Sequence, residues 1–154
     1  MKYTLALLVF ISSTLTNAQE PSAEVLNQII SEFTNNLDPL YGDEISELEV
    51  LYTSTISFDD RAEELIYGED YENPVYSIKY EVTSIQAKNL EKELSRFLLL
   101  NLKGFNYEQV SKRSNLATHM YVNPELGITV ELSIPRNARG SASNVLIEIY
   151  RSED

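Results

Sequence analysis

The stretch YSIKYEVTSIQAKNLEKELSRFLLLNLKG, residues 76–104, decides the fold class because its hydrophobic period changes within a few residues. In its first part apolar and polar side chains alternate, as they do in a strand that is buried on one face. The inward set is Tyr76, Ile78, Tyr80 and Val82, and the outward set is Ser77, Lys79, Glu81 and Thr83. From Gln86 onward apolar residues recur at three- and four-residue steps, which predicts an amphipathic helix. Gly104 stands where a C-terminal helix cap belongs, so the stretch predicts a strand followed directly by a helix.

The flanking residues extend this pattern in both directions. Before the central stretch, a helix is predicted from Ser22 to Phe33 and a long half-buried strand over residues 48–58. After it, the predicted strands cover residues 107–122, with a bend, then 128–134 and 145–151, and residues 124–127 form a hairpin turn. The order is α-ββ-α-βββ. It predicts an α+β fold, an antiparallel sheet with two helices packed on one face.

The two predicted helices also resemble each other in sequence. A shift of 64 positions pairs Ala23 with Ala87, Leu26 with Leu90, Ile30 with Leu94, Ser31 with Ser95 and Phe33 with Phe97. One interpretation is an internal duplication in which each copy is a helix followed by strands. The alternative is a chance resemblance, because amphipathic helices share a pattern for physical reasons alone.

The N-terminus predicts a cleaved secretory signal at residues 1–18, followed by a single α+β domain at residues 19–154. Lys2 precedes the apolar run from Leu5 to Ile11, and the small residue Ala18 stands at the expected cleavage site. This run is shorter than the roughly 20 residues that span a bilayer, so we expect no stable membrane anchor after cleavage. The chain has no cysteine, which suits a secreted or periplasmic protein whose core is large enough to fold without disulfides.

Negative charge is concentrated in the first half of the predicted domain. The whole chain has a formal charge of −12. Residues 19–84 hold 16 acidic side chains against two basic ones, whereas residues 85–154 hold eight against nine. Nucleic acids and anionic membranes need a cationic surface, so this charge excludes them as main partners and favours a cationic protein. Solubility alone is the alternative explanation of the charge.

The search for catalytic motifs predicts no catalytic residue, no cofactor and no metal site. His119 is the only histidine, and we expect it to be an exposed strand residue. The apolar set expected on its strand is Leu116, Thr118, Met120 and Val122. Glu49 and Glu81 are expected to point outward on neighbouring strands, which leaves a carboxylate-dependent hydrolase as a third functional hypothesis.

The segment FDDRAEELIYGEDYENP, residues 58–74, carries seven acidic side chains, one arginine and two tyrosines. Its spacing does not fit an EF-hand, because counting from Asp59 places Arg61 at the third ligand position. The remaining interpretations are a looser calcium site, a solvated connection with a short helical turn at residues 62–66, and a docking loop. Acids steer a cationic partner and tyrosines supply contact area. The predicted partner-binding residues are Asp59, Asp60, Glu63, Glu64, Tyr67, Glu69, Asp70, Tyr71 and Glu72.

Together these features predict an exported, non-catalytic protein-binding module of an inhibitor or immunity type. It would engage a cationic protein through the loop at residues 59–73. The alternative function is a carrier of a small apolar ligand or lipid, held between the sheet and the helices. In that case Tyr52, Tyr76 and Tyr80 would give the cavity its polar groups.

Overall fold

The computed structural model describes residues 20–46, 50–68, 73–113, 116–135 and 142–152. The predicted signal at residues 1–18 lies outside the described residues and stays a prediction. Within the described ranges, no helix is both long enough and apolar enough to cross a membrane.

The described residues form two helices and eight strands in the order α-ββββ-α-ββββ, which confirms the α+β fold. The first half contains α1 (Ala23–Thr34), a 3-10 turn (Asp38–Leu40), β1 (Tyr41–Glu44), β2 (Val50–Ser54), β3 (Glu63–Gly68) and β4 (Val75–Thr83). The second half contains α2 (Ser84–Asn101), β5 (Asn106–Arg113), β6 (Leu116–Asn123), β7 (Ile128–Pro135) and β8 (Ala142–Arg151).

Three strands go beyond the sequence-based prediction. Strands β1 and β3 were not expected, and the predicted strand at residues 107–122 is a pair, β5 and β6. Strand β3 lies where a short helical turn was the expected local structure. Its residues pair on both sides, since Leu65 lies opposite Thr53 of β2 and opposite Ser77 of β4. These long-range hydrogen bonds override the local preference of an acidic sequence.

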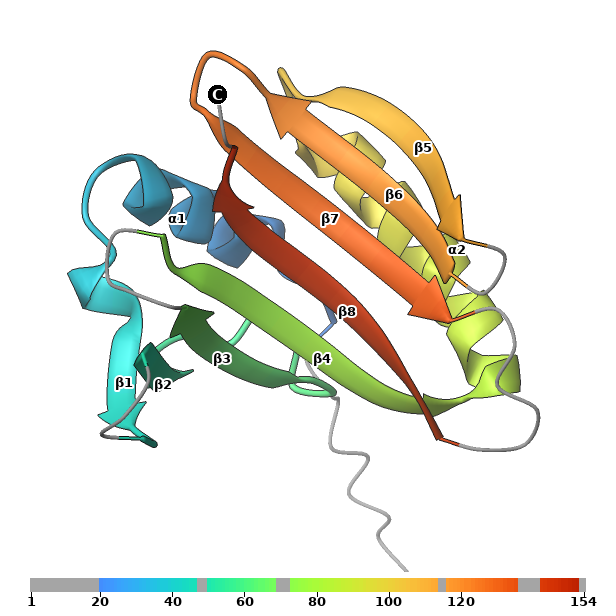
Figure 1. Cartoon of the computed structure of the whole chain (residues 1–154), viewed down its shortest axis with the longest axis horizontal. Helices are drawn as coiled ribbons and strands as arrows, with labels where there is room; N and C mark the ends of the chain where they lie inside the picture. Colours follow the sequence, from blue (N-terminus) through green and yellow to red (C-terminus); the bar gives the residue numbers. More distant parts are fainter. Residues whose placement is uncertain (1–19, 47–49, 69–72, 114–115, 136–141, 153–154) are drawn as a thin grey trace, which may run out of the picture.

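All the strands belong to one sheet, in the order β1-β2-β3-β4-β8-β7-β6-β5, and every neighbouring pair is antiparallel. The last strand of the chain, β8, therefore lies at the centre of the sheet beside β4 (Figure 1). The first half of the chain supplies the four neighbouring strands between one edge of the sheet and its centre, and the second half supplies the other four.

The offset of 64 residues that relates the two helices also relates parts of the two sets of strands. Ile66 of β3 and Val130 of β7 stand 64 positions apart, and both are fully buried. The turn residues Asp59 and Asn123 are also 64 positions apart. Each accepts, at 3.0 Å, a hydrogen bond from the backbone N–H two residues later. An internal duplication would produce such correspondences, and it stays a prediction.

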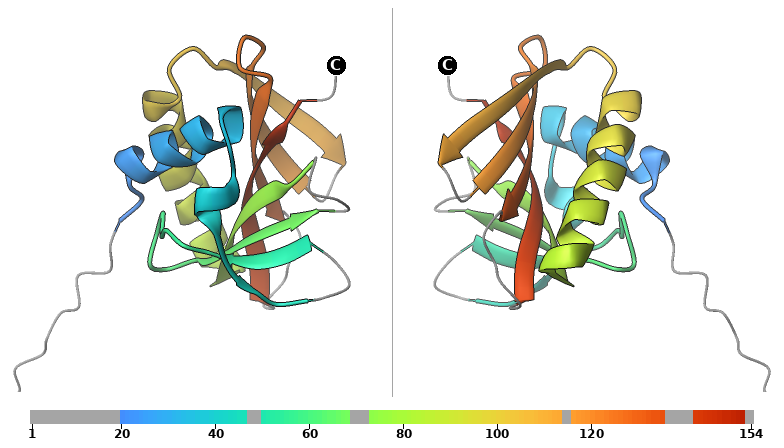
Figure 2. Two further views of the ribbon diagram at one scale, coloured as in Figure 1. Left: turned by 90° about the vertical axis from the view of Figure 1, so that its left-hand side faces the viewer. Right: turned by 90° about the vertical axis from the view of Figure 1, so that its right-hand side faces the viewer.

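Both helices lie on the same face of the sheet, as the edge-on views show (Figure 2). The central row of the core consists of Ile78, Ile147 and Leu132, which are cross-strand partners on β4, β8 and β7 and are fully buried. Leu94 and Leu98 of α2 belong to the same hydrophobic cluster. The inward phase predicted for β4 is thus confirmed.

Local sequence signals set the ends of several elements. The Thr83 side chain and Gln86 form a reciprocal capping box at the start of α2. Between β6 and β7 the predicted hairpin turn at residues 124–127 is confirmed. Gly127 closes it with a φ of +62°, a conformation that other residues rarely adopt.

The second face of the sheet is covered by neither helix, and we call it the open face. Residues directly opposite on neighbouring strands share a face, so the strand register gives its rows. The central row consists of Thr53, Leu65, Ser77, Glu148, Glu131, Met120 and Glu108. The neighbouring row consists of Leu51, Tyr67, Val75, Tyr150, Thr129, Val122 and Asn106.

The phase predicted for β6 is wrong, and His119 is not an exposed residue. The His119 side chain faces the helices and is buried, with 6% of the residue exposed. Its Nε2 atom lies 3.1 Å from the Glu91 carboxylate of α2, and its Nδ1 atom lies 2.9 Å from the Tyr107 hydroxyl of β5. Met120 lies on the open face instead, beside Glu131 and Glu108. Because the open face of β6 is itself apolar, alternation alone does not tell which side is buried.

Candidate functional site

Asp59, the first of the predicted partner-binding residues, is fully buried and is held by Arg61 and Tyr80. Arg61 donates to both carboxylate oxygens, at 2.9 and 2.7 Å, and also reaches Glu93 of α2 at 2.6 Å. Burial acts to raise the pKa of Asp59, but the hydrogen bonds from Arg61 and Tyr80 outweigh it and hold the pKa below its ordinary value. Asp59 is therefore an internal anchor that joins the sheet to α2.

Glu64 is also used inside the fold. One of its carboxylate oxygens accepts the backbone N–H groups of Phe58, at 2.7 Å, and Asp59, at 3.2 Å. The other accepts the Tyr76 hydroxyl at 2.5 Å. Burial raises the pKa of Glu64, although these hydrogen bonds act in the opposite direction. Its role is to fix the loop that leads from β2 into β3.

The tyrosines that were expected to line a ligand cavity under the sheet are part of the packed structure. Tyr76 and Tyr80 are buried in the hydrophobic cluster, and their hydroxyl groups bind the carboxylates of Glu64 and Asp59. Tyr52 is half-buried and packs edge-on against Tyr41, with ring centroids 4.8 Å apart. These rings fill space in the core.

The other residues of the acidic segment lie at the surface or outside the described residues. Asp60 is exposed and accepts a hydrogen bond from Ser57. Glu63 forms an ion pair of 3.1 Å with Lys79. Glu69, Asp70, Tyr71 and Glu72 lie outside the described residues. The structure thus separates the described part of the predicted set into an internal pair of carboxylates, two surface acids and Tyr67.

Tyr67 leads to a different group of acids, at the middle of the open face. It lies on β3, and its hydroxyl donates a hydrogen bond to Glu148 of β8. Glu148 and Glu131 are cross-strand partners on β8 and β7, so their side chains stand directly opposite each other. We call Glu131 and Glu148 the carboxylate pair.

Hydroxyl groups surround the carboxylate pair. The Tyr150 hydroxyl donates to one oxygen of Glu131 at 3.1 Å, and the Ser133 hydroxyl donates to the other at 3.0 Å. Burial and the neighbouring carboxylates raise the pKa values of Tyr67 and Tyr150. Both phenols therefore keep their protons and remain donors at neutral and moderately alkaline pH.

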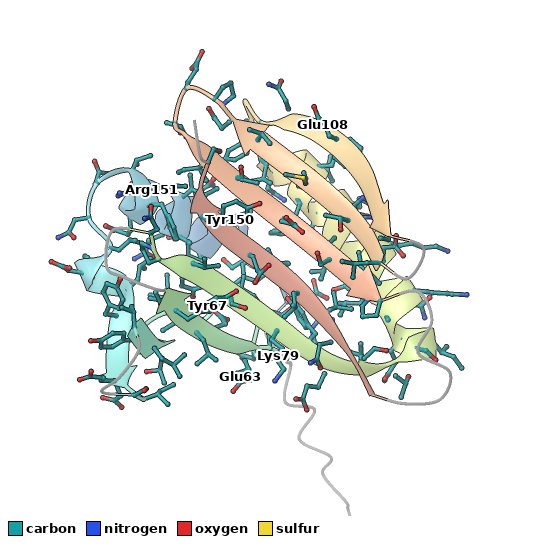
Figure 3. All side chains as sticks on the ribbon, in the orientation of Figure 1. Glu63, Tyr67, Lys79, Glu108, Tyr150 and Arg151 are labelled. Carbon is teal, nitrogen blue, oxygen red and sulfur yellow. The ribbon has the colours of Figure 1, made fainter. Side chains whose placement is uncertain are left out.

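No cation of the described part of the chain neutralises the carboxylate pair. Like charges that face each other across two strands destabilise a sheet. Lys79 lies on the same face but is engaged by Glu63 and Glu81, at 3.1 Å each. Glu108 adds a further exposed acid on the same row, at the edge strand (Figure 3). The open face is therefore an acidic surface with tyrosine and methionine side chains at its centre.

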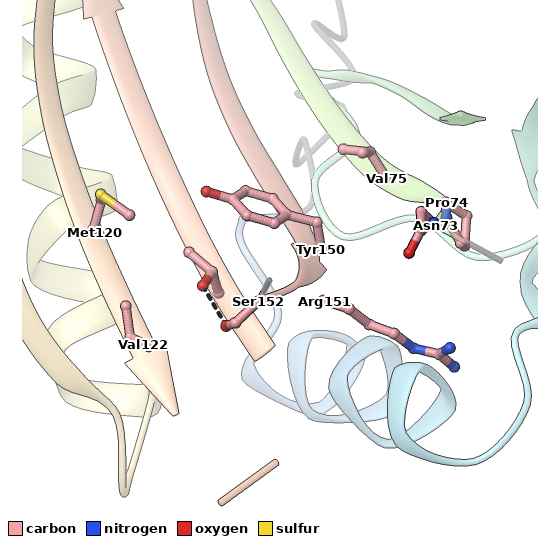
Figure 4. A pocket seen from close by; sticks show the side chains of 9 residues that line it. Asn73, Pro74, Val75, Met120, Val122, Tyr150, Arg151 and Ser152 are labelled. Carbon is pink, nitrogen blue, oxygen red and sulfur yellow. Dashed lines mark hydrogen bonds between the residues drawn. The ribbon is translucent and has the colours of Figure 1, made fainter. Parts of the chain in front are cut away.

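A shallow pocket of about 480 Å³ lies at one end of the open face (Figure 4), and its residues Thr129 and Tyr150 are two positions along their strands from the carboxylate pair. We call it the end pocket. Its lining residues are Asn73, Pro74, Val75, Met120, Val122, Thr129, Tyr150, Arg151 and Ser152. The hydroxyl groups of Thr129 and Ser152 hydrogen-bond to each other at 2.8 Å. Tyr150 belongs to both features, because its ring lines the pocket and its hydroxyl binds Glu131.

No family model, curated protein or solved structure matches the chain. Its chemistry is therefore inferred from the open face alone. In the described ranges no three His, Cys, Asp or Glu side chains gather in a way that could hold a metal ion. What the open face offers is negative charge, hydroxyl donors and the half-buried side chains of Tyr67, Tyr150 and Met120.

The predicted pairing of Glu49 with Glu81 is wrong, because β3 lies between β2 and β4. Glu49 itself lies outside the described residues, and Glu81 binds Lys79. The carboxylates that do face each other, Glu131 and Glu148, were not predicted. Alternation along each strand places both of them outward, but only the register between β7 and β8 brings them together.

Proposed function

We propose that the protein is a non-catalytic binding module for a cationic protein and that it binds through the open face. The observation that carries this proposal is the carboxylate pair. Glu131 and Glu148 face each other at the centre of an uncovered sheet, and no described lysine, arginine or histidine forms an ion pair with them. A lysine or arginine side chain of a partner would relieve their repulsion.

The groups around the carboxylate pair support a cationic occupant over an anionic or neutral one. The three hydroxyl groups that donate to the carboxylates are neutral, so they stabilise the negative charge without cancelling it, and a cation can still add to them. Tyr67 and Tyr150 lie in the row next to the pair, each with its hydroxyl on one of the two carboxylates, and aromatic faces attract ammonium and guanidinium groups.

The charge of the whole molecule supports fast association with such a partner. The chain has a formal charge of −12, and Glu63, Glu81 and Glu108 surround the central residues of the open face. A field of one sign steers an oppositely charged protein and raises its association rate. We expect salt to weaken the interaction mainly by slowing this step.

The acidic segment keeps part of its predicted role in this proposal. Tyr67 and Glu63 come from it and lie on the open face. Residues 69–72 directly follow β3 in the chain and remain candidate contacts. Since the N-terminal pattern predicts export, the proposed partner would be met in the periplasm or outside the cell.

Peptide titration provides the test. The ¹⁵N-labelled protein is titrated with a short lysine-containing peptide and with the same peptide carrying glutamine, and the amide shifts of β7 and β8 are followed. We expect the lysine peptide to bind at the open face and the double variant Glu131→Gln/Glu148→Gln to weaken it about tenfold. The matched control removes two charges elsewhere, at the exposed residues Glu24 and Glu44, by the same glutamine substitutions. Equal weakening of lysine-peptide binding in both double variants would mean that only the net charge of the protein matters, and this would contradict the proposed site.

A further inference from the structure

We propose that the end pocket and the carboxylate pair form one composite site, which recognises an extended segment of the partner. This segment carries a lysine or arginine at one position and a bulky apolar residue two positions away. The inference rests on the proposed function and names the motif that it would bind.

The spacing of the two features along the strands supports an extended occupant. Glu131 and Thr129 are two positions apart on β7, and Glu148 and Tyr150 are two positions apart on β8. Two residues of a strand span about 6.6 Å. In an extended partner segment, the side chains at positions i and i+2 lie on one side with the same spacing. One side chain can therefore reach the carboxylate pair while the second enters the end pocket.

The walls of the end pocket suit an apolar side chain. Val75, Val122, Met120 and the ring of Tyr150 supply carbon and sulfur surface. The hydroxyl groups of Thr129 and Ser152 satisfy each other, so this part of the wall does not depend on a polar ligand atom. The pocket volume of about 480 Å³ leaves room for one bulky side chain.

Tyr150 couples the two halves of the composite site. Its ring forms one wall of the end pocket, and its hydroxyl holds the Glu131 carboxylate in place at 3.1 Å. An apolar side chain of the partner, packed against the Tyr150 ring, would hold the ring in the rotamer in which its hydroxyl binds Glu131. The apolar and cationic contacts should therefore strengthen each other, and each should be weaker alone.

The experiment compares four capped peptides, of which the first two have the same composition. The first contains Gly-Lys-Ser-Phe-Gly, with lysine and phenylalanine two positions apart, and the second contains Gly-Lys-Phe-Ser-Gly, with the two adjacent. A third peptide replaces lysine by glutamine in the first, and a fourth separates lysine and phenylalanine by three serines. Amide shifts of the labelled protein give the dissociation constants. We expect the first peptide to bind about tenfold more tightly than the second, because only it can bury the ring while its ammonium group meets Glu131.

Two variants separate this inference from the proposed function. Met120→Gln/Val122→Thr makes the pocket walls polar with little change in shape, and it should remove the advantage of the first peptide while keeping the lysine-dependent binding. Glu131→Gln/Glu148→Gln should weaken every lysine peptide. If lysine peptides bind regardless of spacing, the composite site is wrong and the proposed function stands. If Glu131→Gln/Glu148→Gln binds lysine peptides as tightly as the wild type does, the proposed function fails. Equal binding of the third peptide, or tightest binding of the fourth, would also overturn the motif.

Discussion

The hydroxyl group of Tyr80 donates a hydrogen bond of 2.9 Å to the Asp59 carboxylate, in the fully buried part of the molecule. Arg61 holds the same carboxylate by two further hydrogen bonds and continues to Glu93 of α2. A strand, a loop and a helix are thus joined through one acidic side chain. A segment rich in acids therefore has a structural role that its composition does not reveal.

Loss of this network should lower stability. Asp59→Asn removes one of the two charge partners of Arg61 and should lower the free energy of unfolding by about 2 kcal/mol, less than for a fully buried pair because Arg61 is partly exposed and keeps Glu93. Tyr80→Phe removes one hydrogen bond and should cost about 1 kcal/mol. Urea denaturation measures both. The neighbouring exposed residue provides the control, since Asp60→Asn should change stability by no more than about 0.5 kcal/mol.

Glu64 should make the free energy of unfolding depend on pH above 4.5, where an ordinary glutamate is already ionised. Burial raises its folded-state pKa above 4.5, so the native protein binds this proton more tightly than the unfolded chain does. The contribution of Glu64 to stability is therefore present below pH 4.5 and is lost as the pH rises through the folded pKa. Glu64→Gln cannot titrate, so its stability relative to the wild type should increase from about pH 4.5 toward neutrality.

Denaturation at a series of pH values tests this, and Asp59 supplies a contrast of opposite sign. The pKa of Asp59 lies below 3.8, so its contribution is lost only as the pH falls below that value. The pH range in which the contribution of Glu64 changes therefore lies above that of Asp59, and the two ranges do not overlap. A constant difference between Glu64→Gln and the wild type over the whole series would show that Glu64 has no raised pKa.

The carboxylate pair should lower the stability of the free protein. Glu148→Gln removes the repulsion with Glu131 but keeps an oxygen that can accept the Tyr67 hydroxyl. We expect this variant to be more stable by about 0.5 kcal/mol and to bind lysine peptides less well. Thermal unfolding at low and high salt measures the first effect, which salt should diminish. A destabilised Glu148→Gln protein would mean that the carboxylates serve the fold.

A buried hydroxyl on β6 provides a further test. Thr118 is fully buried, and within the described residues its hydroxyl has no hydrogen-bond partner. Thr118→Val should raise the free energy of unfolding by about 1 kcal/mol, because an unsatisfied polar group is replaced by a methyl group of similar shape. Thr129→Val is the matched control on β7. Its hydroxyl binds Ser152, so the same change should lower stability by about 1 kcal/mol. Both values follow from chemical denaturation.

The sequence predicted the elements whose signals are local. The period of the apolar residues from Gln86 and the cap signal at Gly104 placed α2, and the turn ending at Gly127 placed the hairpin between β6 and β7. It did not predict β3, because EELIYG becomes a strand only through pairing with β2 and β4. The orientation of His119 was wrong because both faces of β6 carry apolar side chains.

The candidate site depends on the register between strands that are distant in the sequence, so local sequence patterns could not predict it. Glu131 and Glu148 each read as an outward strand residue, one of many acids in the chain. Their opposition follows from the place of β8 at the centre of the sheet, which no local signal specifies. Among the described residues of the predicted set, Tyr67 is the one that contacts the carboxylate pair.

The central position of β8 also constrains the order of folding. Its ladder with β4 joins Thr83 to Ala142 and Tyr76 to Ile149, so it closes a loop that contains α2 and three strands. Two four-stranded halves can form early, each with a long unpaired edge, but they merge only when the final strand is in place. Removal of that strand would leave β4 and β7 as open edges, and we expect such a truncated chain to aggregate through them.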